Sequence, residues 1–179
     1  MKTNSSENCL KTSDTEKETC IFPFSFSLHE NEFIRNLPQN VRSGLTLAKA
    51  LRIDSVVRQH LHIPEINRIE LEQLKTDDVI TTYMLKTCLF FLYAEQQNSP
   101  KTLQANSCQW SEMIYQRLRK CIAARKLETY YGDGVLFQCG DHTEDDKVNR
   151  VCCQRRLLIL RMCDAILKFL GNHRTELQV

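Results

Sequence analysis

The segment Asp78–Gln96, DVITTYMLKTCLFFLYAEQ, constrains the fold most, because it is apolar almost without interruption from Val79 to Tyr93. These 15 residues are too few to span a bilayer, which needs about 20. A helix that is apolar on every side is instead typical of the centre of a globular domain. Asp77 and Asp78 predict its start, since carboxylates cap a helix N-terminus and interact favourably with its dipole.

One charge, Lys86, lies in the middle of this apolar segment. Two interpretations are open, because an ammonium buried without a partner costs on the order of several kcal/mol. Either the stem runs along the surface and the ammonium reaches water, or the ammonium points into a polar cleft where an anion binds. Tyr83 lies three residues earlier and projects from nearly the same face. An aromatic ring beside an ammonium suits a nucleotide, and it is equally ordinary in a core.

The composition is that of one globular domain. A chain of 179 residues with 42% hydrophobic and 26% charged residues has enough material for a real core. Only five glycines and four prolines are present, which argues against a many-turned β-fold. The net charge of +2 is too small to indicate a polyanionic partner by itself.

Nine cysteines accompany a polar N-terminus, and neither a signal peptide nor a transmembrane segment is recognisable. This combination favours reduced thiols over a disulfide framework. We therefore expect a cytoplasmic or nuclear protein that does not bind membranes.

The N-terminal region is predicted to begin with a disordered tail over residues 1–19, which are almost entirely polar. Phe22, Phe24 and Phe26 then alternate with smaller residues, which predicts a short strand or extended segment. Ser27 and Glu30 match a capping box, so a short helix is predicted from about Leu28 to Asn36, ended by Pro38.

Helical spacing governs most of the remaining chain. A helix beginning near Asn40 carries the stripe Val41, Leu45, Ala48 and Leu51. Gly44 inside it either weakens the helix by about 1 kcal/mol or permits a close helix contact. A further helix carries Trp110, Met113, Ile114, Leu118, Cys121 and Ile122.

The C-terminal third is predicted to contain a turn-rich connection over Lys126–Phe137, broken by Gly132 and Gly134. A long helix from about Glu144 to Leu170 follows, with Gly171 beyond its end. Its stripe is Val148, Val151, Cys152, Leu158, Met162, Ile166 and Phe169. The fold class is therefore all-α: a helical bundle lobe of about five helices with a short extended N-terminal segment, spanning residues 20–171 and followed by a tail over residues 172–179.

Two charged or metal-binding patterns have simpler explanations. Cys139 and His142 with Cys152 and Cys153 offer zinc-ligand types, but adjacent cysteines in a helix diverge by ~100° and structural zinc prefers separated pairs. The run Glu144–Asp146 fits a helix N-terminus better than a metal site.

A basic face is the third such pattern. Arg117, Arg119, Lys120, Arg125 and Lys126 follow Trp110. They either bind phosphates or form the solvated side of an amphipathic helix, and the second interpretation is the commoner.

Four short motifs in order resemble a known family. They are Ser25-Phe26-Ser27 opening a helix, Lys49 in LAKALR, Thr82 to Thr87 in TYMLKT, and Lys126 to Tyr131 in KLETYY. Over about residues 21–170 the chain resembles the C-terminal helical lobe of the male-abnormal (Mab) twenty-one-like proteins. That family includes cyclic GMP–AMP synthase and related innate-immune receptors.

The resemblance implies a nucleotide-binding role for four residues. In the family, a nucleotidyltransferase binds nucleotides between a mixed α/β catalytic core and this lobe. By resemblance, Tyr83 stacks on a base, Lys49 and Lys86 meet phosphates, and Thr82 lines the same cleft. Binding a phosphate would explain why the charged residue Lys86 lies in the middle of an apolar segment.

The chain also departs from the family. It has no Gly-Ser pair and no predicted sheet to carry the acidic metal ligands. The chain is therefore expected to lack the residues that bind the Mg²⁺ needed for phosphoryl transfer. Pro23 replaces a common arginine, and Met84 replaces the synthase's histidine. The synthase's zinc-bearing insertion is missing, because Leu37–Asn40 joins the first two helices directly.

The expected function is therefore that of a helical lobe of a cyclic GMP–AMP synthase-like nucleotidyltransferase, a fragment or degenerate paralogue that is inactive alone. No cofactor is expected in this chain, since Mg²⁺ or Mn²⁺ would come only with the missing catalytic core. The expected partners are ATP or GTP and a catalytic core lobe or other protein, whereas binding of nucleic acid by this chain alone is not expected. The alternative is a non-enzymatic helical adaptor.

Overall fold

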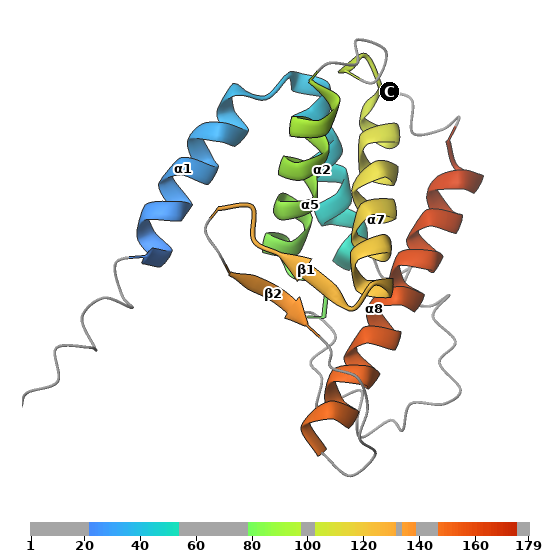
Figure 1. Cartoon of the computed structure of the whole chain (residues 1–179). Coiled ribbons are helices and arrows are strands. Elements are labelled where there is room, and N and C mark those ends of the chain that lie inside the picture. Colours follow the sequence, from blue (N-terminus) through green and yellow to red (C-terminus); the bar gives the residue numbers. More distant parts are fainter. Residues whose placement is uncertain (1–21, 54–78, 98–102, 132–133, 139–146, 175–179) are drawn as a thin grey trace, which may run out of the picture. The chain divides into compact units, whose positions relative to one another are not determined.

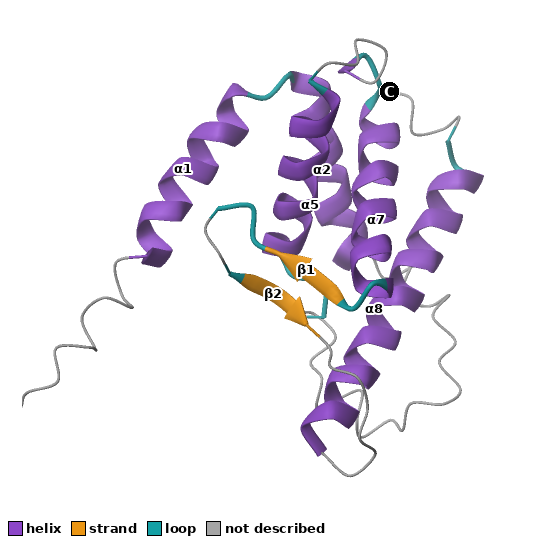
Figure 2. Cartoon of the chain, in the orientation of Figure 1, coloured by secondary structure: helices purple, strands orange, loops and turns teal. Residues whose placement is uncertain are grey.

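The structure is a computed structural model that describes residues 22–53, 79–97, 103–131, 134–138 and 147–174. Within these ranges it contains five helices and one two-stranded sheet (Figures 1 and 2). The helices are α1 (Phe22–Asn36), α2 (Gln39–Ile53), α5 (Thr82–Gln96), α7 (Ser107–Ala123) and α8 (Lys147–Asn172). The predicted all-α helical fold is confirmed.

The chain divides into two compact units, residues 1–36 and residues 37–179. The division falls inside the range 20–171 that the sequence suggests for one helical domain. The first unit contains α1, and the second contains every other described element. Residues 1–19, the link between α2 and α5, and the tail after Arg174 lie outside the described residues, so the expectations for them stay predictions.

Helix α1 corrects the prediction of an extended segment and of a capping box at Ser27. The helix already begins at Phe22, five residues before Ser27. Pro23 fits there because its missing N–H needs no partner in the first turn of a helix. Extending an existing helix towards its N-terminus also costs less than starting a new one. The predicted end at Asn36 is correct.

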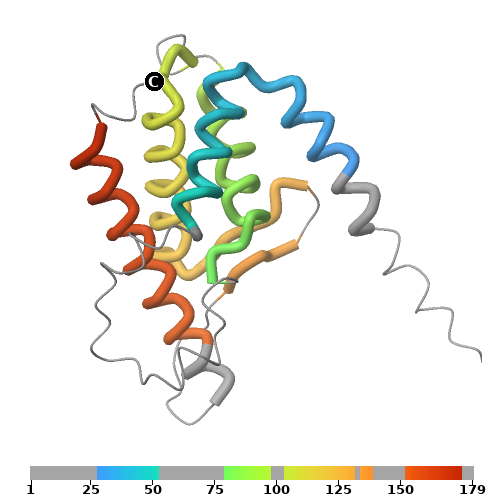
Figure 3. The backbone as a smooth tube through the Cα atoms, turned by 180° about the vertical axis from the view of Figure 1, so that it is seen from behind, coloured from blue at the N-terminus to red at the C-terminus, as the bar shows by residue number. Residues whose placement is uncertain are grey.

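The centre of the second unit is α7, which packs against α2, α5, α8 and the first strand (Figures 1 and 3). The sequence instead suggested α5 as the central helix. Helix α5 is the most apolar of these helices and packs against α2 and α7. A uniformly apolar sequence ensures burial, but the arrangement of the neighbours decides which helix lies in the middle. The buried residues of α7 are Cys108, Trp110, Ser111, Ile114, Tyr115, Leu118 and Ile122.

The start of α5 also differs from the prediction. Its N-cap is Thr81, whose side-chain oxygen accepts a hydrogen bond from the Met84 backbone N–H at 3.2 Å. Val79 and Ile80 are fully buried but precede the helix. The helix therefore begins three residues later than the apolar run. Asp77 and Asp78 lie outside the described residues.

The contact between α2 and α7 confirms the second interpretation of Gly44. The stripe predicted for α2, Val41, Leu45, Ala48 and Leu51, is buried. A Cβ atom on Gly44 would clash with the Cβ of Trp110 and lie 3.1 Å from the Ser107 carbonyl oxygen. The absence of a side chain thus lets the two helices approach closely. Nearby, the Tyr115 hydroxyl donates a 2.7 Å hydrogen bond to the Ala48 carbonyl.

A β-hairpin replaces the predicted turn-rich connection after α7. Strands β1 (Lys126–Glu128) and β2 (Val135–Gln138) pair antiparallel, with Leu127 opposite Phe137 and both side chains buried. Strands this short give no measurable alternation in the sequence. Arg125 ends α7 in the left-handed region, with φ of 62°.

Helix α8 begins at Lys147 and ends at Asn172, so Gly171 lies inside it and not beyond its end. The run Glu144–Asp146 lies outside the described residues. The Arg156 guanidinium donates to the carbonyls of Ile122 and Ala123 at 3.0 Å each, which satisfies two carbonyls at the C-terminus of α7. The fully or nearly fully buried residues of α8 are Leu158, Ile159, Met162, Cys163, Ile166 and Leu170.

None of the described helices combines the length and the apolar character that crossing a bilayer requires.

Candidate anion-binding site between α2 and α5

The four residues proposed from the sequence lie on two neighbouring helices. Lys49 lies on α2 directly after the buried Ala48 and is partly exposed. Thr82, Tyr83 and Lys86 lie on α5 and are also partly exposed. Met84, Leu85 and Thr87, between and beside them, are buried. Helical spacing thus places the three candidates of α5 on its less buried side.

The C-terminal end of α2 and the N-terminal end of α5 lie at the same end of the bundle (Figures 1 and 3). Arg52, in the last turn of α2, connects them: its Nη1 donates a 2.8 Å hydrogen bond to the carbonyl of Ile80, two residues before α5. This contact sets the position of the start of α5 relative to α2.

Positive charges gather at this junction. The pKa of Lys49 is lowered chiefly by burial, then by the charge of Lys86, and then by that of Arg52. Lys86 and Arg52 are therefore close enough to Lys49 to repel its ammonium. Among the described residues no carboxylate contributes to this shift. An anion placed beside Lys49 would offset both the burial and the repulsion.

Sequence reasoning missed Arg52 as a member of this group. Its spacing of three residues from Lys49 in LAKALR puts both side chains on one side of α2. That spacing could have been recognised in the sequence. The hydrogen bond from Arg52 to the Ile80 carbonyl could not have been predicted from it, because the two residues are 28 positions apart.

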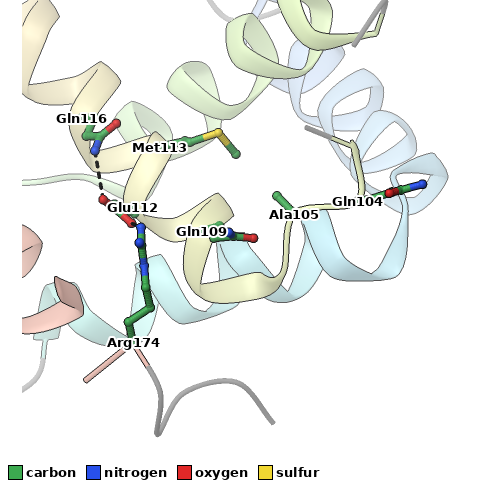
Figure 4. A pocket seen from close by; sticks show the side chains of 7 residues that line it. All are labelled: Gln104, Ala105, Gln109, Glu112, Met113, Gln116 and Arg174. Atoms are coloured by element: carbon green, nitrogen blue, oxygen red, sulfur yellow. Dashed lines mark hydrogen bonds and ion pairs between the residues drawn. The ribbon is translucent and has the colours of Figure 1, made fainter. Parts of the chain in front are cut away.

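A hollow lies along the face of α7 (Figure 4). Its volume is about 440 Å³. Glu112 is one of the polar residues that line it. Its carboxylate accepts hydrogen bonds from the Arg174 guanidinium at 2.6 Å and from the Gln116 side-chain amide at 3.1 Å. Its lining residues are Gln104, Ala105, Gln109, Glu112, Met113, Gln116 and Arg174, so none of the four candidate residues borders it.

The basic face of α7 is occupied by ion pairs between helices. Arg117 pairs with Glu95 of α5 through bonds of 2.6 and 2.7 Å, and its guanidinium lies 5.4 Å from the centre of the Phe91 ring. Arg119 pairs with Asp164 of α8 at 2.5 Å. These carboxylates neutralise cations that a phosphate would otherwise contact. The arrangement favours the interpretation as the solvated side of an amphipathic helix.

The proposed zinc ligands are only partly described, since Cys139 and His142 lie outside the described residues. The Cys152 thiol donates to the Gln138 carbonyl at 3.3 Å. In the described ranges, no group of three or more His, Cys, Asp or Glu residues is arranged to hold a metal ion. Burial raises the pKa of the Cys88 and Cys163 thiols, which keeps both protonated and poorly nucleophilic at neutral pH.

The chain matches no family model, no curated protein and no solved structure.

Proposed function

We propose that this chain is a nucleotide-binding helical lobe like that of cyclic GMP–AMP synthase-like nucleotidyltransferases. The proposal rests on the junction of α2 and α5, where Arg52 donates a 2.8 Å hydrogen bond to the Ile80 carbonyl and Lys49 lies three residues before Arg52. Burial and the charges of Lys86 and Arg52 lower the pKa of Lys49 there. Groups whose pKa values are shifted by burial and by neighbouring charges cluster at functional sites. The proposed ligand is ATP or GTP, bound with its phosphates between Lys49 and Lys86.

Tyr83 supplies the second part of the proposed site. It lies one turn before Lys86 on the partly exposed side of α5. A base stacked on an aromatic ring gains about 1–3 kcal/mol. In the proposed complex the tyrosine ring binds the base, Thr82 lines the cleft beside it, and the two lysines bind the phosphates.

The rest of the enzyme is proposed as a separate partner. The chain contains no Gly-Ser pair, and its described sheet consists only of the hairpin β1–β2. We propose that a catalytic core lobe, supplied by another polypeptide or a longer form of this one, carries the metal ions. The proposed location is the cytoplasm or nucleus, in agreement with six free cysteines among the described residues.

The test is a calorimetric titration in which ATP or GTP is added to the purified chain and the affinity is measured. Replacing Lys86 with alanine is expected to weaken nucleotide binding about tenfold, since a hydrogen bond to a charged group contributes roughly 1.5–3 kcal/mol. The matched control is Lys168→Ala, which removes an exposed lysine from α8 and should leave the affinity unchanged. Circular dichroism checks that both variants keep the helical content of the wild type.

Equal affinities for the wild type and Lys86→Ala would contradict the proposal. The chain would then be better described as the alternative, a helical adaptor. An adaptor has no need for Lys49, Tyr83 and Lys86 to share a site, and its protein-binding surface would lie elsewhere.

The chain alone is expected to make no cyclic dinucleotide from ATP and GTP with Mg²⁺ or Mn²⁺. Phosphoryl transfer depends on metal ions held by carboxylates, and the sequence shows no acidic set of that kind beside a Gly-Ser pair. Chromatography of the reaction mixture against a protein-free control checks this. A product peak that grows with protein concentration would show that the chain carries its own catalytic residues.

A further inference from the structure

We propose that the hollow along α7 binds short zwitterionic peptides, that is, peptides roughly three residues long with a free ammonium and a free carboxylate. Its volume of about 440 Å³ lies within the range of about 300–1,000 Å³ that small-molecule sites usually have. None of the residues proposed to bind a nucleotide borders it. The inference therefore adds a second site and does not depend on nucleotide binding.

One side of α7 provides most of the lining. Its four residues there follow the spacing of side chains that share one side of a helix; they are Gln109, Glu112, Met113 and Gln116. Arg174, which follows the end of α8, borders the same hollow (Figure 4). From Gln109 to Gln116 the stripe runs about 10 Å along the helix axis, which is the length of an extended peptide of about three residues.

The charges that line the hollow balance each other. Among the described residues of the lining, only Glu112 and Arg174 are charged, and the Arg174 Nη2 donates to the Glu112 Oε2 at 2.6 Å. An anion would therefore meet the guanidinium beside a carboxylate, and a cation would meet the carboxylate beside a guanidinium. A ligand that carries both charges and no net charge suits both residues.

Both charged residues have hydrogen-bonding capacity that their ion pair leaves unused. An arginine has five N–H donors, and an ionised carboxylate has about four acceptor positions. Among the described residues, Arg174 donates only to Glu112, and Glu112 accepts only from Arg174 and Gln116. The side chains of Arg174 and Glu112 are 50% and 22% exposed, so a ligand can reach both.

Two glutamine amides give the hollow a direction. The Gln109 Oε1 accepts a 2.9 Å hydrogen bond from the Asn106 backbone N–H in the capping box of α7, which leaves the Gln109 Nε2 as a donor. The Gln116 Nε2 donates to Glu112 at 3.1 Å, which leaves the Gln116 Oε1 as an acceptor. We therefore place the peptide carboxylate against Gln109 and Arg174. The peptide ammonium then lies against Glu112 and Gln116.

An ordinary ion pair between helices is the alternative interpretation of Glu112 and Arg174. Arg119 and Asp164 form such a pair between α7 and α8, about 10 Å further along α7, and neither of them lines the hollow. Exposed ion pairs contribute little to stability. Substitutions in either pair should therefore leave the fold intact, so the two pairs can be compared directly.

The test is an NMR titration of the isotope-labelled full chain, because this method detects weak binding. Three ligands are compared: triglycine, which is zwitterionic, N-acetyltriglycine, which lacks the ammonium, and triglycinamide, which lacks the carboxylate. We expect triglycine to bind about fivefold more tightly than either analogue, since each analogue loses a hydrogen bond between charged groups at a partly exposed site. Triglycine should also shift the side-chain amide signals of Gln109 and Gln116.

Two substitutions should change the ligand preference in opposite directions. Glu112→Gln is expected to weaken triglycine binding about fivefold but to leave N-acetyltriglycine binding unchanged or tighter, because Arg174 loses its competing carboxylate. Arg174→Gln is expected to weaken the binding of triglycine and N-acetyltriglycine about fivefold and to leave triglycinamide binding unchanged or tighter. The matched control, Arg119→Gln, should change none of the three affinities.

Two outcomes would overturn the inference. The first is the absence of signal shifts at a large excess of triglycine, or equal affinities for the three ligands, which would leave Glu112 and Arg174 as an ordinary ion pair. The second is an equal effect of Arg119→Gln and Arg174→Gln, which would attribute the binding to the net charge of the surface. Neither outcome would affect the nucleotide proposal, because that proposal is tested with ATP and GTP through Lys86, which does not border the hollow.

Discussion

Replacing Gly44 with alanine is expected to lower the free energy of unfolding by about 2 kcal/mol. The new methyl group would clash with the Cβ of Trp110 and lie 3.1 Å from the Ser107 carbonyl oxygen. These atoms are part of the backbone or attached directly to it, so rotating a side chain cannot relieve the clash. Overpacking usually costs about 1–3 kcal/mol, and a clash with atoms this close to the backbone lies at the upper end of that range. The gain of about 1 kcal/mol in helix propensity offsets only part of this cost. Urea unfolding followed by circular dichroism measures the change.

Gly171→Ala is the matched control for Gly44→Ala. Gly171 also lies in a helix, α8, but a Cβ atom there meets nothing within 4 Å. Its replacement should leave the protein equally stable or stabilise it by up to about 1 kcal/mol. If both substitutions stabilised the protein, α2 and α7 would not be in close contact at Gly44.

The second large effect is expected at Leu158, where alanine should lower the free energy of unfolding by about 2–5 kcal/mol. Leu158 is 1% exposed on the side of α8 that faces the bundle. Leu157, the preceding residue, is 49% exposed, so Leu157→Ala should cost less than about 0.5 kcal/mol. The same urea experiment measures both variants.

The comparison of these neighbours tests the rotation of α8 about its own axis. Successive residues of a helix point about 100° apart, so a small error in that rotation would exchange their environments. Equal losses from the two substitutions would mean that α8 presents a different face to α7.

Helical periodicity predicted much of the fold because it is a local property of the chain. The stripe of α2 from Val41 to Leu51 is buried as expected, and α7 and α8 lie where their apolar residues recur every three or four positions. An apolar stripe requires burial whichever element covers it. Lys86 and Tyr83 stood out by their place in the apolar segment, whereas Lys49 and Thr82 were named from a resemblance. The proposed role of all four remains a prediction.

Short elements and helix ends were predicted less well, because few residues decide them. Strand β1 has three residues and β2 has four, which is too few for alternation to be recognised. The start of α5 depends on one hydroxyl, that of Thr81. The aromatic alternation from Phe22 to Phe26 suggested a strand, whereas the chain continues the helix of residues 28–36 through it.

Local patterns in the sequence are enough to predict that this chain forms amphipathic helices and which face of α2 is buried. The central place of α7 and the position of Arg52 near Lys49 follow instead from contacts between distant residues. Asn40 binds the carbonyls of Leu103 and Ala105 from 63 and 65 residues away, and Arg52 reaches Ile80 from 28 residues away. Periodicity indicates which side of a helix is buried. Which charged residues of different helices lie close together depends on how the helices pack.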